Sequence, residues 1–214
     1  MNGVTFGEIH SYHDLHLILL PFAPTPATPK TSFLTVPGRD GTLDLTEANG
    51  CVRYNDRVFS FTFVVAPGDT MAFDDRATAV SNALNGVRCN ITLDRDPAYY
   101  WLGRCEVSNL TRSRSGAQIV VKATVQPYKL KQNTTVVSVA LSSTPKSIVL
   151  KNNRMAVNPT IECTEGAVVT FGGNDYTLAA GTHKILDIRL TEGKNLLTAS
   201  GTGTMTITWQ EGAL

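Results

Sequence analysis

The sequence has no long apolar run, few cysteines and no excess of charge of either sign. No stretch approaches the roughly 18 apolar residues of a membrane-spanning helix. The longest early apolar patch, Leu15 to Phe22, is broken by His16 and Pro21, and no basic segment precedes it as in a secretory signal. We therefore expect no membrane insertion, and a protein that stays in the cytoplasm until it is assembled into a larger structure.

The charges nearly cancel along the whole chain. Nineteen Lys and Arg face eighteen Asp and Glu over 214 residues, for a formal net charge of +1. Residues 1–133 hold 13 basic and 12 acidic side chains, and residues 134–214 hold six of each. Because nucleic-acid binding by phosphate neutralisation needs a basic excess, sequence-specific nucleic-acid binding is not predicted.

The four cysteines, Cys51, Cys89, Cys105 and Cys163, include no Cys-x-x-Cys pair. A zinc site built on close cysteine pairs is therefore not predicted. We expect four buried thiols that lie in strands, because free cysteine behaves as a small apolar residue.

Three histidines, His10, His13 and His16, follow one another at steps of three. In a strand, His10 and His16 would face one side and His13 the other, so a shared metal ion is not predicted. Ser11, His13 and Asp14 are the residue types of a hydrolase triad, but adjacency in sequence is no evidence of triad geometry.

The adjacent Asp74 and Asp75 invite an acid–base interpretation. They lie where a helix is predicted to begin, and acidic side chains there interact favourably with the helix dipole. No other carboxylate pair or metal cluster suggests catalysis. The sequence therefore predicts that the protein is not an enzyme and holds no cofactor and no metal.

One helix is predicted. Phe73, Ala77, Val80 and Leu84 follow the spacing of a single apolar stripe. Asp69 or Thr70 can cap its beginning, and Gly86 can close its end as the residue with positive φ.

Strands are predicted over most of the remaining chain. Phe59, Phe61 and Phe63 share one face of Arg57 to Ala66, and their burial contributes about 5–9 kcal/mol, so we expect this strand to be central. Tyr99-Tyr100-Trp101 opens another strand and could form an aromatic platform for sugars or bases, or pack in a core. The other strands predicted in this half are Val4 to Ile9, Thr31 to Val36, Val87 to Leu93, Tyr99 to Val107 and Ala117 to Val125.

The pattern breaks at Gln126 to Asn133, which predicts a domain boundary between residues 1–130 and residues 134–214. Beyond it, about eight short strands predict a compact β-sandwich of jelly-roll type. Leu186, Ile188 and Leu190 are expected to share a face of one of these strands. The predicted strands are Val136 to Leu141, Ser147 to Leu150, Thr160 to Cys163, Val168 to Phe171, Tyr176 to Leu178, His183 to Leu190 and a last one that buries Met205, Ile207 and Trp209.

The stretch from Val36 to Glu47 predicts two tight turns that lead into a strand. Pro37-Gly38 suits the centre of a type II turn, and Asp40-Gly41 offers a second reversal. Leu43 and Leu45 would then face one way in a half-buried strand. The preceding prolines, Pro21, Pro24, Pro26 and Pro29, cannot donate a regular hydrogen-bond ladder. They predict an extended arm, which suits either contact with a neighbouring subunit or a plain surface loop.

Two of these segments resemble one protein family. Val36-Pro37-Gly38-Arg39-Asp40-Gly41, followed by Leu43-Asp44-Leu45-Thr46-Glu47, is similar to a segment of the phage distal tail (Dit) proteins. His10, Ser11, Asp14, Leu15 and Leu17 fit the family's N-terminal pattern, in which a glycine commonly stands at the position of His16. The chain also ends, as the family often does, in an aromatic strand with Trp209 and a short tail.

The resemblance implies a mainly β fold: an N-terminal β-sheet or sandwich domain with one α-helix, which builds a ring, and a C-terminal galectin-like sandwich. It implies a structural virion protein at the distal tip of a long non-contractile tail, assembled in the host cytoplasm. Six copies would join the tail tube protein to the tail-associated hub protein of the baseplate and let DNA pass. The candidate interface residues are Arg39, Asp40, Asp44, Glu47, Pro24 and Pro26.

A different class of function remains open from the residues alone. The C-terminal sandwich and the Tyr99-Tyr100-Trp101 cluster would also suit a carbohydrate-binding adhesin that serves host attachment. Because sandwich folds host many functions, fold analogy alone carries little weight here. Short members of the family lack inserted carbohydrate-binding modules, and a chain of 214 residues has no room for one.

Overall fold

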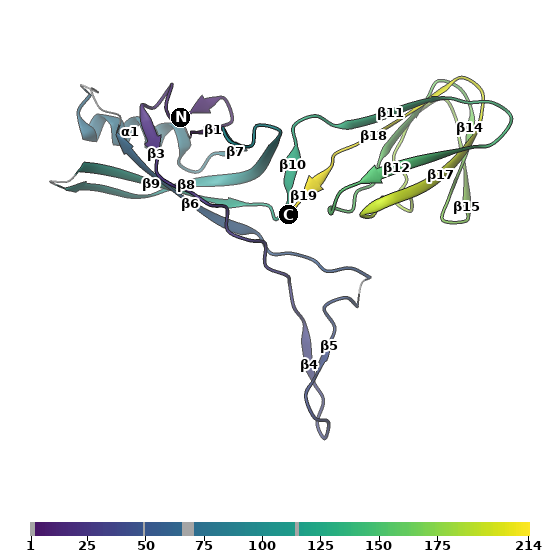
Figure 1. The fold of residues 1–214 in the computed structure, drawn as a ribbon, viewed down its shortest axis with the longest axis horizontal. Coiled ribbons are helices and arrows are strands. Elements are labelled where there is room, and N and C mark those ends of the chain that lie inside the picture. Colours follow the sequence, from purple (N-terminus) through teal and green to yellow (C-terminus); the bar gives the residue numbers. More distant parts are fainter. Residues whose placement is uncertain (1–2, 49, 66–70, 114–115) are drawn as a thin grey trace. The chain divides into compact units, whose positions relative to one another are not determined.

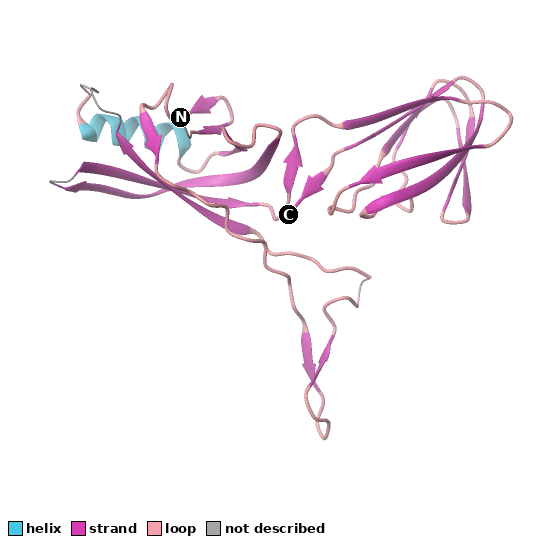
Figure 2. Cartoon of the chain, in the orientation of Figure 1, coloured by secondary structure: helices cyan, strands magenta, loops and turns pink. Residues whose placement is uncertain are grey.

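The computed structural model of the protein describes residues 3–48, 50–65, 71–113 and 116–214. The chain divides into two compact units, Met1–Lys129 and Leu130–Leu214. Both are built mainly of β-strands, and the one helix among the described residues belongs to the first unit (Figures 1 and 2). The predicted fold class, a mainly β chain with a one-helix sheet domain followed by a β-sandwich, is confirmed.

The N-terminal unit contains an antiparallel sheet with strand order β2-β1-β7-β8-β9-β6-β3. Its strands are β1 (Val4–Phe6), β2 (Ile9–His10), β3 (Leu17–Leu19), β6 (Arg57–Val65), β7 (Arg88–Leu93), β8 (Tyr99–Ser113) and β9 (Gly116–Val125). A separate hairpin joins β4 (Phe33–Thr35) to β5 (Thr42–Asp44). Residues 114 and 115, between β8 and β9, lie outside the described residues.

The phenylalanine strand β6 lies last but one in the sheet, beside the three-residue β3. The expectation that β6 would be central is therefore wrong. The error arises because burial of one face depends on what packs against that face, whereas lateral position depends on strand pairing.

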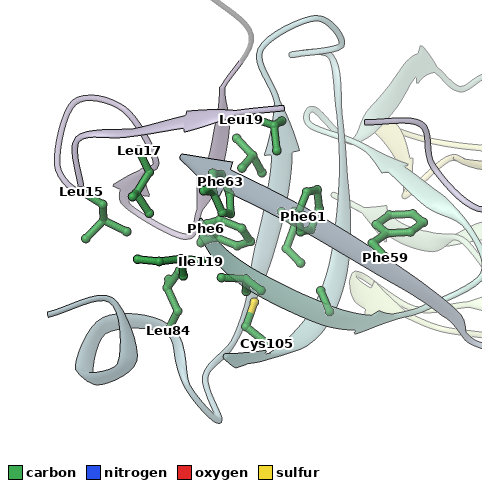
Figure 3. Packing of buried hydrophobic residues seen from close by; sticks show 14 of the residues in the cluster. Phe6, Leu15, Leu17, Leu19, Phe59, Phe61, Phe63, Leu84, Cys105 and Ile119 are labelled. Carbon is green, nitrogen blue, oxygen red and sulfur yellow. The ribbon is translucent and has the colours of Figure 1, made fainter. Parts of the chain in front are cut away.

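The core of the N-terminal unit is aromatic. Phe59, Phe61 and Phe63 have no exposed surface, as their alternation predicted. Phe6 of β1 meets Phe61 edge-on, with 5.5 Å between ring centroids, a favoured aromatic geometry. Figure 3 shows Phe6 close to Phe63, with Leu84 of the helix below them in this view.

The helix α1 spans Phe73–Leu84, as predicted, and buries Ala77, Val80 and Leu84. It follows Ala72, which makes no side-chain cap, and the expected caps Asp69 and Thr70 lie outside the described residues. Gly86 has the predicted positive φ, 77°, but its N–H donates to the carbonyl of Cys105 in β8 rather than to a carbonyl of the helix. Within the described chain, no helix is long and apolar enough to cross a membrane.

The histidine segment builds a tight connection between β2 and β3. Nδ1 of His10 accepts hydrogen bonds from the backbone N–H groups of Tyr12 and His13, each at 3.1 Å. The Asp14 carboxylate accepts from the N–H of His10 at 2.7 Å, and the Ser11 hydroxyl accepts from the N–H of Val4 at 3.2 Å. These side chains satisfy backbone groups, as turn residues do, so the segment that could have held a metal or a triad instead forms a turn.

His16 has φ of 51°, in the left-handed region that favours glycine. It is exposed, so no burial of its ring offsets this conformation. The backbone therefore gives a physical reason why glycine suits this position.

The C-terminal unit is a sandwich of two four-stranded sheets, with orders β11-β18-β13-β16 and β12-β17-β14-β15. The core between the sheets includes Leu150, Ile161, Leu197, Met205 and Ile207, none with exposed surface. The strands are β11 (Thr135–Ala140), β12 (Lys146–Asn152), β13 (Thr160–Cys163), β14 (Ala167–Phe171), β15 (Asn174–Leu178), β16 (Gly181–His183), β17 (Gly193–Gly201) and β18 (Thr204–Trp209).

The segment from His183 to Leu190 is not the predicted strand. β16 ends at His183, and Leu186 is 79% exposed whereas Ile188 and Leu190 are fully buried. The side-chain amide of Asn158 donates to the carbonyls of Leu186 and Ile188 at 2.7 and 2.9 Å. The side-chain amide of Asn158 thus binds carbonyls that would otherwise pair with a neighbouring strand. The alternation of apolar residues gives no sign of such an arrangement.

Strand β17 was missed by the sequence pattern because its inward face includes Asn195. This amide is only 7% exposed and is buried with partners: its Nδ2 donates to the carbonyl of Thr191 at 2.8 Å, and its Oδ1 accepts from the N–H of Thr191 at 2.9 Å. A polar residue at a buried position breaks the apolar alternation on which strand prediction depends.

The two ends of the C-terminal unit are joined by Glu211. Its carboxylate accepts from the ammonium of Lys131 at 3.1 Å, from the amide of Asn153 at 2.7 Å and from the hydroxyl of Thr135. Backbone pairing joins the same region, because β10 (Lys129–Lys131) pairs with β19 (Gly212–Ala213). Three partners for one largely buried carboxylate compensate for its desolvation.

We predict that His16→Gly leaves the free energy of unfolding unchanged or raises it by up to about 1 kcal/mol, because glycine adopts positive φ without strain. The matched control is His13→Gly, an exposed histidine without positive φ, which should lower the free energy of unfolding by roughly 0.5–1 kcal/mol. Urea unfolding measures both. Equal destabilisation by the two substitutions would contradict the role given to the backbone at His16.

Candidate assembly surfaces

The most exposed part of the N-terminal unit is an arm formed by residues 21–56, which leaves the sheet after β3 and returns at β6 (Figure 1). Its proline segment is extended, as predicted, and no strand lies between Pro21 and Ser32 in the described chain. The two legs touch at an isolated bridge between Pro29 and Tyr54. The β4–β5 hairpin forms the far end of the arm.

The outgoing leg of the arm is anchored by Phe22. Its ring lies 4.4 Å from that of Phe61 and 5.5 Å from that of Phe59, centroid to centroid. The guanidinium of Arg95 lies over the Phe22 ring, 5.9 Å from its centre, and donates to the carbonyl of Phe22 at 2.8 Å. Phe22, the second residue of the arm, therefore packs against the aromatic core.

The returning leg is anchored by Arg57, which is only 6% exposed. Its guanidinium donates to the carbonyl of Thr25 at 2.5 Å and to that of Pro127 at 3.1 Å, and lies 5.1 Å from the ring centre of Phe59. The Thr25 hydroxyl in turn donates to the carbonyl of Val58 at 2.9 Å. Buried arginine needs such partners, and these bonds tie Thr25 of the outgoing leg to the start of β6, where the returning leg ends.

Backbone hydrogen bonds hold the two legs together. The N–H of Lys30 donates to the carbonyl of Arg53 at 2.7 Å, and that of Asn55 donates to Thr28 at 2.9 Å. The prolines remove other donors from the outgoing leg, so these two bonds are spaced rather than continuous.

The predicted type II turn at the tip is confirmed. Gly38 has φ of 79°, and the N–H of Arg39 donates to the carbonyl of Val36 at 3.2 Å. Gly41 also has positive φ, at 72°, before β5 begins. The two turns join the strands of a hairpin in which Phe33 pairs with Asp44 and Thr35 with Thr42.

The expectation of a half-buried strand after these turns is wrong. Phe33 is 58% exposed, Leu34 50% and Leu45 38%, and only Leu43 is partly buried. Among the residues that the structure describes, no other strand of the N-terminal unit pairs with the hairpin. We call the three exposed side chains Phe33, Leu34 and Leu45 the arm patch. By strand alternation, Leu34 and Leu45 lie on one face of the hairpin and Phe33 on the other.

The structure separates the candidate interface residues into three places. Arg39 and Asp40 are exposed at the tip, and Pro24 and Pro26 lie in the outgoing leg. Asp44 and Glu47 are brought together, since both line an open cavity of about 610 Å³ that also contacts Tyr54. The six residues thus share the arm but do not form one cluster.

Asp44 is held by the residue two positions later. Its carboxylate accepts a hydrogen bond from the N–H of Thr46 at 2.9 Å. The hydroxyl and then the backbone N–H of Thr46 lower the pKa of Asp44 below its ordinary value. The charged Asp44 therefore belongs to a local turn that ends β5, which is a structural role for a residue first noted as an interface candidate.

Two polar cross-strand pairs on the sheet were not predicted as a candidate surface. Arg88 lies directly opposite Arg104, and Glu106 lies opposite Lys122. All four line an open cavity of about 680 Å³. The sequence carried this information, because Arg104 and Glu106 of β8 and Lys122 of β9 alternate with buried residues.

The aromatic platform expected of a sugar-binding protein is not available. Trp101 is 3% exposed and packs edge-on against Phe59, with 5.3 Å between ring centroids. The ammonium of Lys129 lies 4.3 Å from the ring centre of Tyr99. Trp209, the second of the two tryptophans, is also 3% exposed. Neither indole can stack on a sugar.

The cysteines differ from the expectation of four buried thiols in strands. Cys105 and Cys163 are buried in β8 and β13, Cys89 is partly buried in β7, and Cys51 is partly buried at a bend of the arm. All four are free. Within the described residues, no three His, Cys, Asp or Glu side chains come together as metal ligands.

A one-helix antiparallel sheet with a long arm, followed by an eight-stranded sandwich, is also found in a solved phage protein. This fold is similar to that of the SPP1 Dit (gp 19.1) protein, described as a paradigm of the hub adsorption apparatus in phages that infect Gram-positive bacteria, with a TM-score of 0.72 and 16% sequence identity over 100% of both chains. The sequence matches no protein-family model and no curated protein. The resemblance stated from the sequence is confirmed at the level of the fold.

We predict that Gly38→Val strains the tip of the hairpin by about 1–2 kcal/mol, because a β-branched residue disfavours positive φ. An added Cβ meets no atom within 4 Å, so the effect is confined to backbone strain and the sheet remains folded. Amide hydrogen exchange should accelerate in β4 and β5 and stay unchanged in β8 and β9. Gly38→Asn, which tolerates positive φ, is the matched control and should preserve protection.

We predict that the turn at Asp44 is stable above pH 3.8, the ordinary pKa of this group, and is lost as the pH falls through its lower folded pKa. The sign follows because a lowered pKa means that the folded turn favours the charged carboxylate. The amide proton of Thr46, followed by NMR during acid titration, reports the transition. A Thr46 amide shift that is insensitive to acid, or unchanged by Asp44→Ala, would contradict the assignment.

Proposed function

We propose that this protein is a structural component of the virion of a long non-contractile phage tail. It forms a ring of six copies at the distal tip of the tail, after assembly in the host cytoplasm. The observation that carries the proposal is the likeness of the backbone to a hub protein of known structure over the full length of both chains.

The arm supports assembly into a ring. Closed rings of identical subunits need two different surfaces, one on each side of every subunit. The arm patch offers an apolar surface on a segment that is anchored at both ends by Phe22 and Arg57. Exposed apolar side chains on a projecting segment are typical of protein–protein contacts. We infer that each arm lies against the N-terminal unit of the next copy, with Arg39, Asp40, Asp44, Glu47, Pro24 and Pro26 near this contact.

The binding partners of the ring follow from its position at the distal tip of the tail. One face binds the last ring of the tail tube protein, and the other binds the tail-associated hub protein. The near-zero net charge agrees with a lumen that lets DNA pass without holding it, because a strongly basic lining would bind phosphate. The chemistry of the protein is therefore interfacial, without a catalytic step.

The direct test is light scattering and negative-stain imaging of the purified protein, alone and mixed with the tail tube and hub proteins of the same phage. We expect six-fold rings, formed alone or in the presence of a partner. A monomer that binds neither protein would refute the proposal.

The role of the arm is tested by the double substitution Phe33→Ser/Leu34→Ser. Because both side chains are at least half exposed, we predict that the free energy of unfolding of the monomer changes by no more than about 0.5 kcal/mol, while ring formation is lost. The matched control is Val149→Ser/Leu196→Ser, a cross-strand pair in the C-terminal unit with exposures of 51% and 60%. Rings that survive the arm substitutions would show that the arm does not join the subunits.

A further inference from the structure

Two of the four thiols meet inside the N-terminal unit. Cys89 of β7 lies opposite Gly103 of β8, and Cys105 lies two residues further along β8, on the same face of the sheet. Their sulfur atoms are 4.0 Å apart. The other cysteines are far from this pair in the chain: Cys51 belongs to the arm and Cys163 to the C-terminal unit.

Gly103 helps to bring the two thiols together. A Cβ at this position would come within 2.5 Å of a methyl group of Val125 and 2.8 Å of the carbonyl of Thr124, so only glycine fits. The strand position directly opposite Cys89 therefore carries no side chain. Cys105 becomes the neighbouring side chain of Cys89 across the β7–β8 pair.

The two thiols differ in access and acidity. Cys105 is 1% exposed, whereas Cys89 is partly exposed. The hydrogen bond from Cys105 lowers the pKa of Cys89, against the opposing effect of burial. The same hydrogen bond, followed by burial, raises the pKa of Cys105. Cys89 is thus the thiol that a reagent reaches and the one that forms the thiolate, which is the attacking species in disulfide chemistry.

We propose that Cys89 and Cys105 are a modification site, at which reaction with a small-molecule disulfide forms a cross-strand disulfide between β7 and β8. The Cys89 thiolate attacks one sulfur of the reagent, the reagent's S–S bond breaks, and one thiolate leaves. Cys105 then loses its proton and attacks Sγ of Cys89, which releases the second thiolate of the reagent. Two protein thiols are oxidised and one disulfide is reduced to two thiols.

The disulfide would join two neighbouring strands of the sheet to which the arm is anchored. The bridge closes the chain between positions 89 and 105 and restricts the unfolded chain, which stabilises the folded unit. To form the bond, the sulfur atoms have to approach by about 2 Å from their separation of 4.0 Å. A protein that leaves the reducing cytoplasm within a virion would meet such oxidising conditions.

The test treats the purified full-length chain with oxidised glutathione and measures free thiols, intact mass and the unfolding temperature. We expect the thiol count to fall from four to two, with a mass loss of about two units for the two hydrogens removed. Peptide mapping should give one bridge, Cys89–Cys105. The unfolding temperature should rise, and a reductant should reverse the change.

Matched variants separate this pair from the other thiols. Cys51→Ser and Cys163→Ser should still form the bridge, and Cys89→Ser should not. Four remaining thiols, a bridge that includes Cys51 or Cys163, or a glutathione adduct on Cys89 that never closes would each overturn the proposal. Disulfide formation is measured within a single chain, so the result does not depend on whether rings form.

Discussion

The packing of Phe22 against Phe59 and Phe61 couples the fold of the N-terminal unit to the position of its arm. The two β6 residues belong to the core, and Phe22 is the point at which the chain leaves it. Arg57, beside Phe59, fixes the point of return. An arm of about 35 residues has a large entropy to lose on ordering, and anchoring both of its ends in one apolar cluster reduces the freedom that remains.

Beyond these anchors the arm has little to stabilise it within one subunit. A two-stranded hairpin is marginal on its own, and the arm patch leaves apolar surface in water. The prolines of the outgoing leg remove backbone donors that could recruit a foreign strand. These features together suit a segment that is completed by contact with a second protein surface, at a side-chain patch rather than by added strands.

Some local features were predicted correctly from the sequence, and others were not. The turn at Gly38, the helix from Phe73 to Leu84 and the inward face of Met205, Ile207 and Trp209 all follow from local preferences, and all agree with the structure. Leu43 and Leu45 were placed on a half-buried strand, and Leu186 on a shared strand face, because alternation shows which residues lie on one face but not what covers that face. Asn195 hid a strand and Asn158 hid a loop. The amide of Asn195 is satisfied by the carbonyls of Thr191 and Leu150, and that of Asn158 by the carbonyl of Leu186, and an apolar alternation pattern shows none of these bonds.

The sequence by itself determined the β-rich class, the turn positions and the apolar faces, because these depend on backbone geometry and on side chains within a few residues of one another. It also carried enough of two motifs to indicate the fold family. Only the tertiary structure decided that the hairpin stands uncovered, that Trp101 lies inside the core, and that Cys89 meets Cys105. Each of these depends on strand order and on contacts between residues far apart in the chain, which local patterns do not encode.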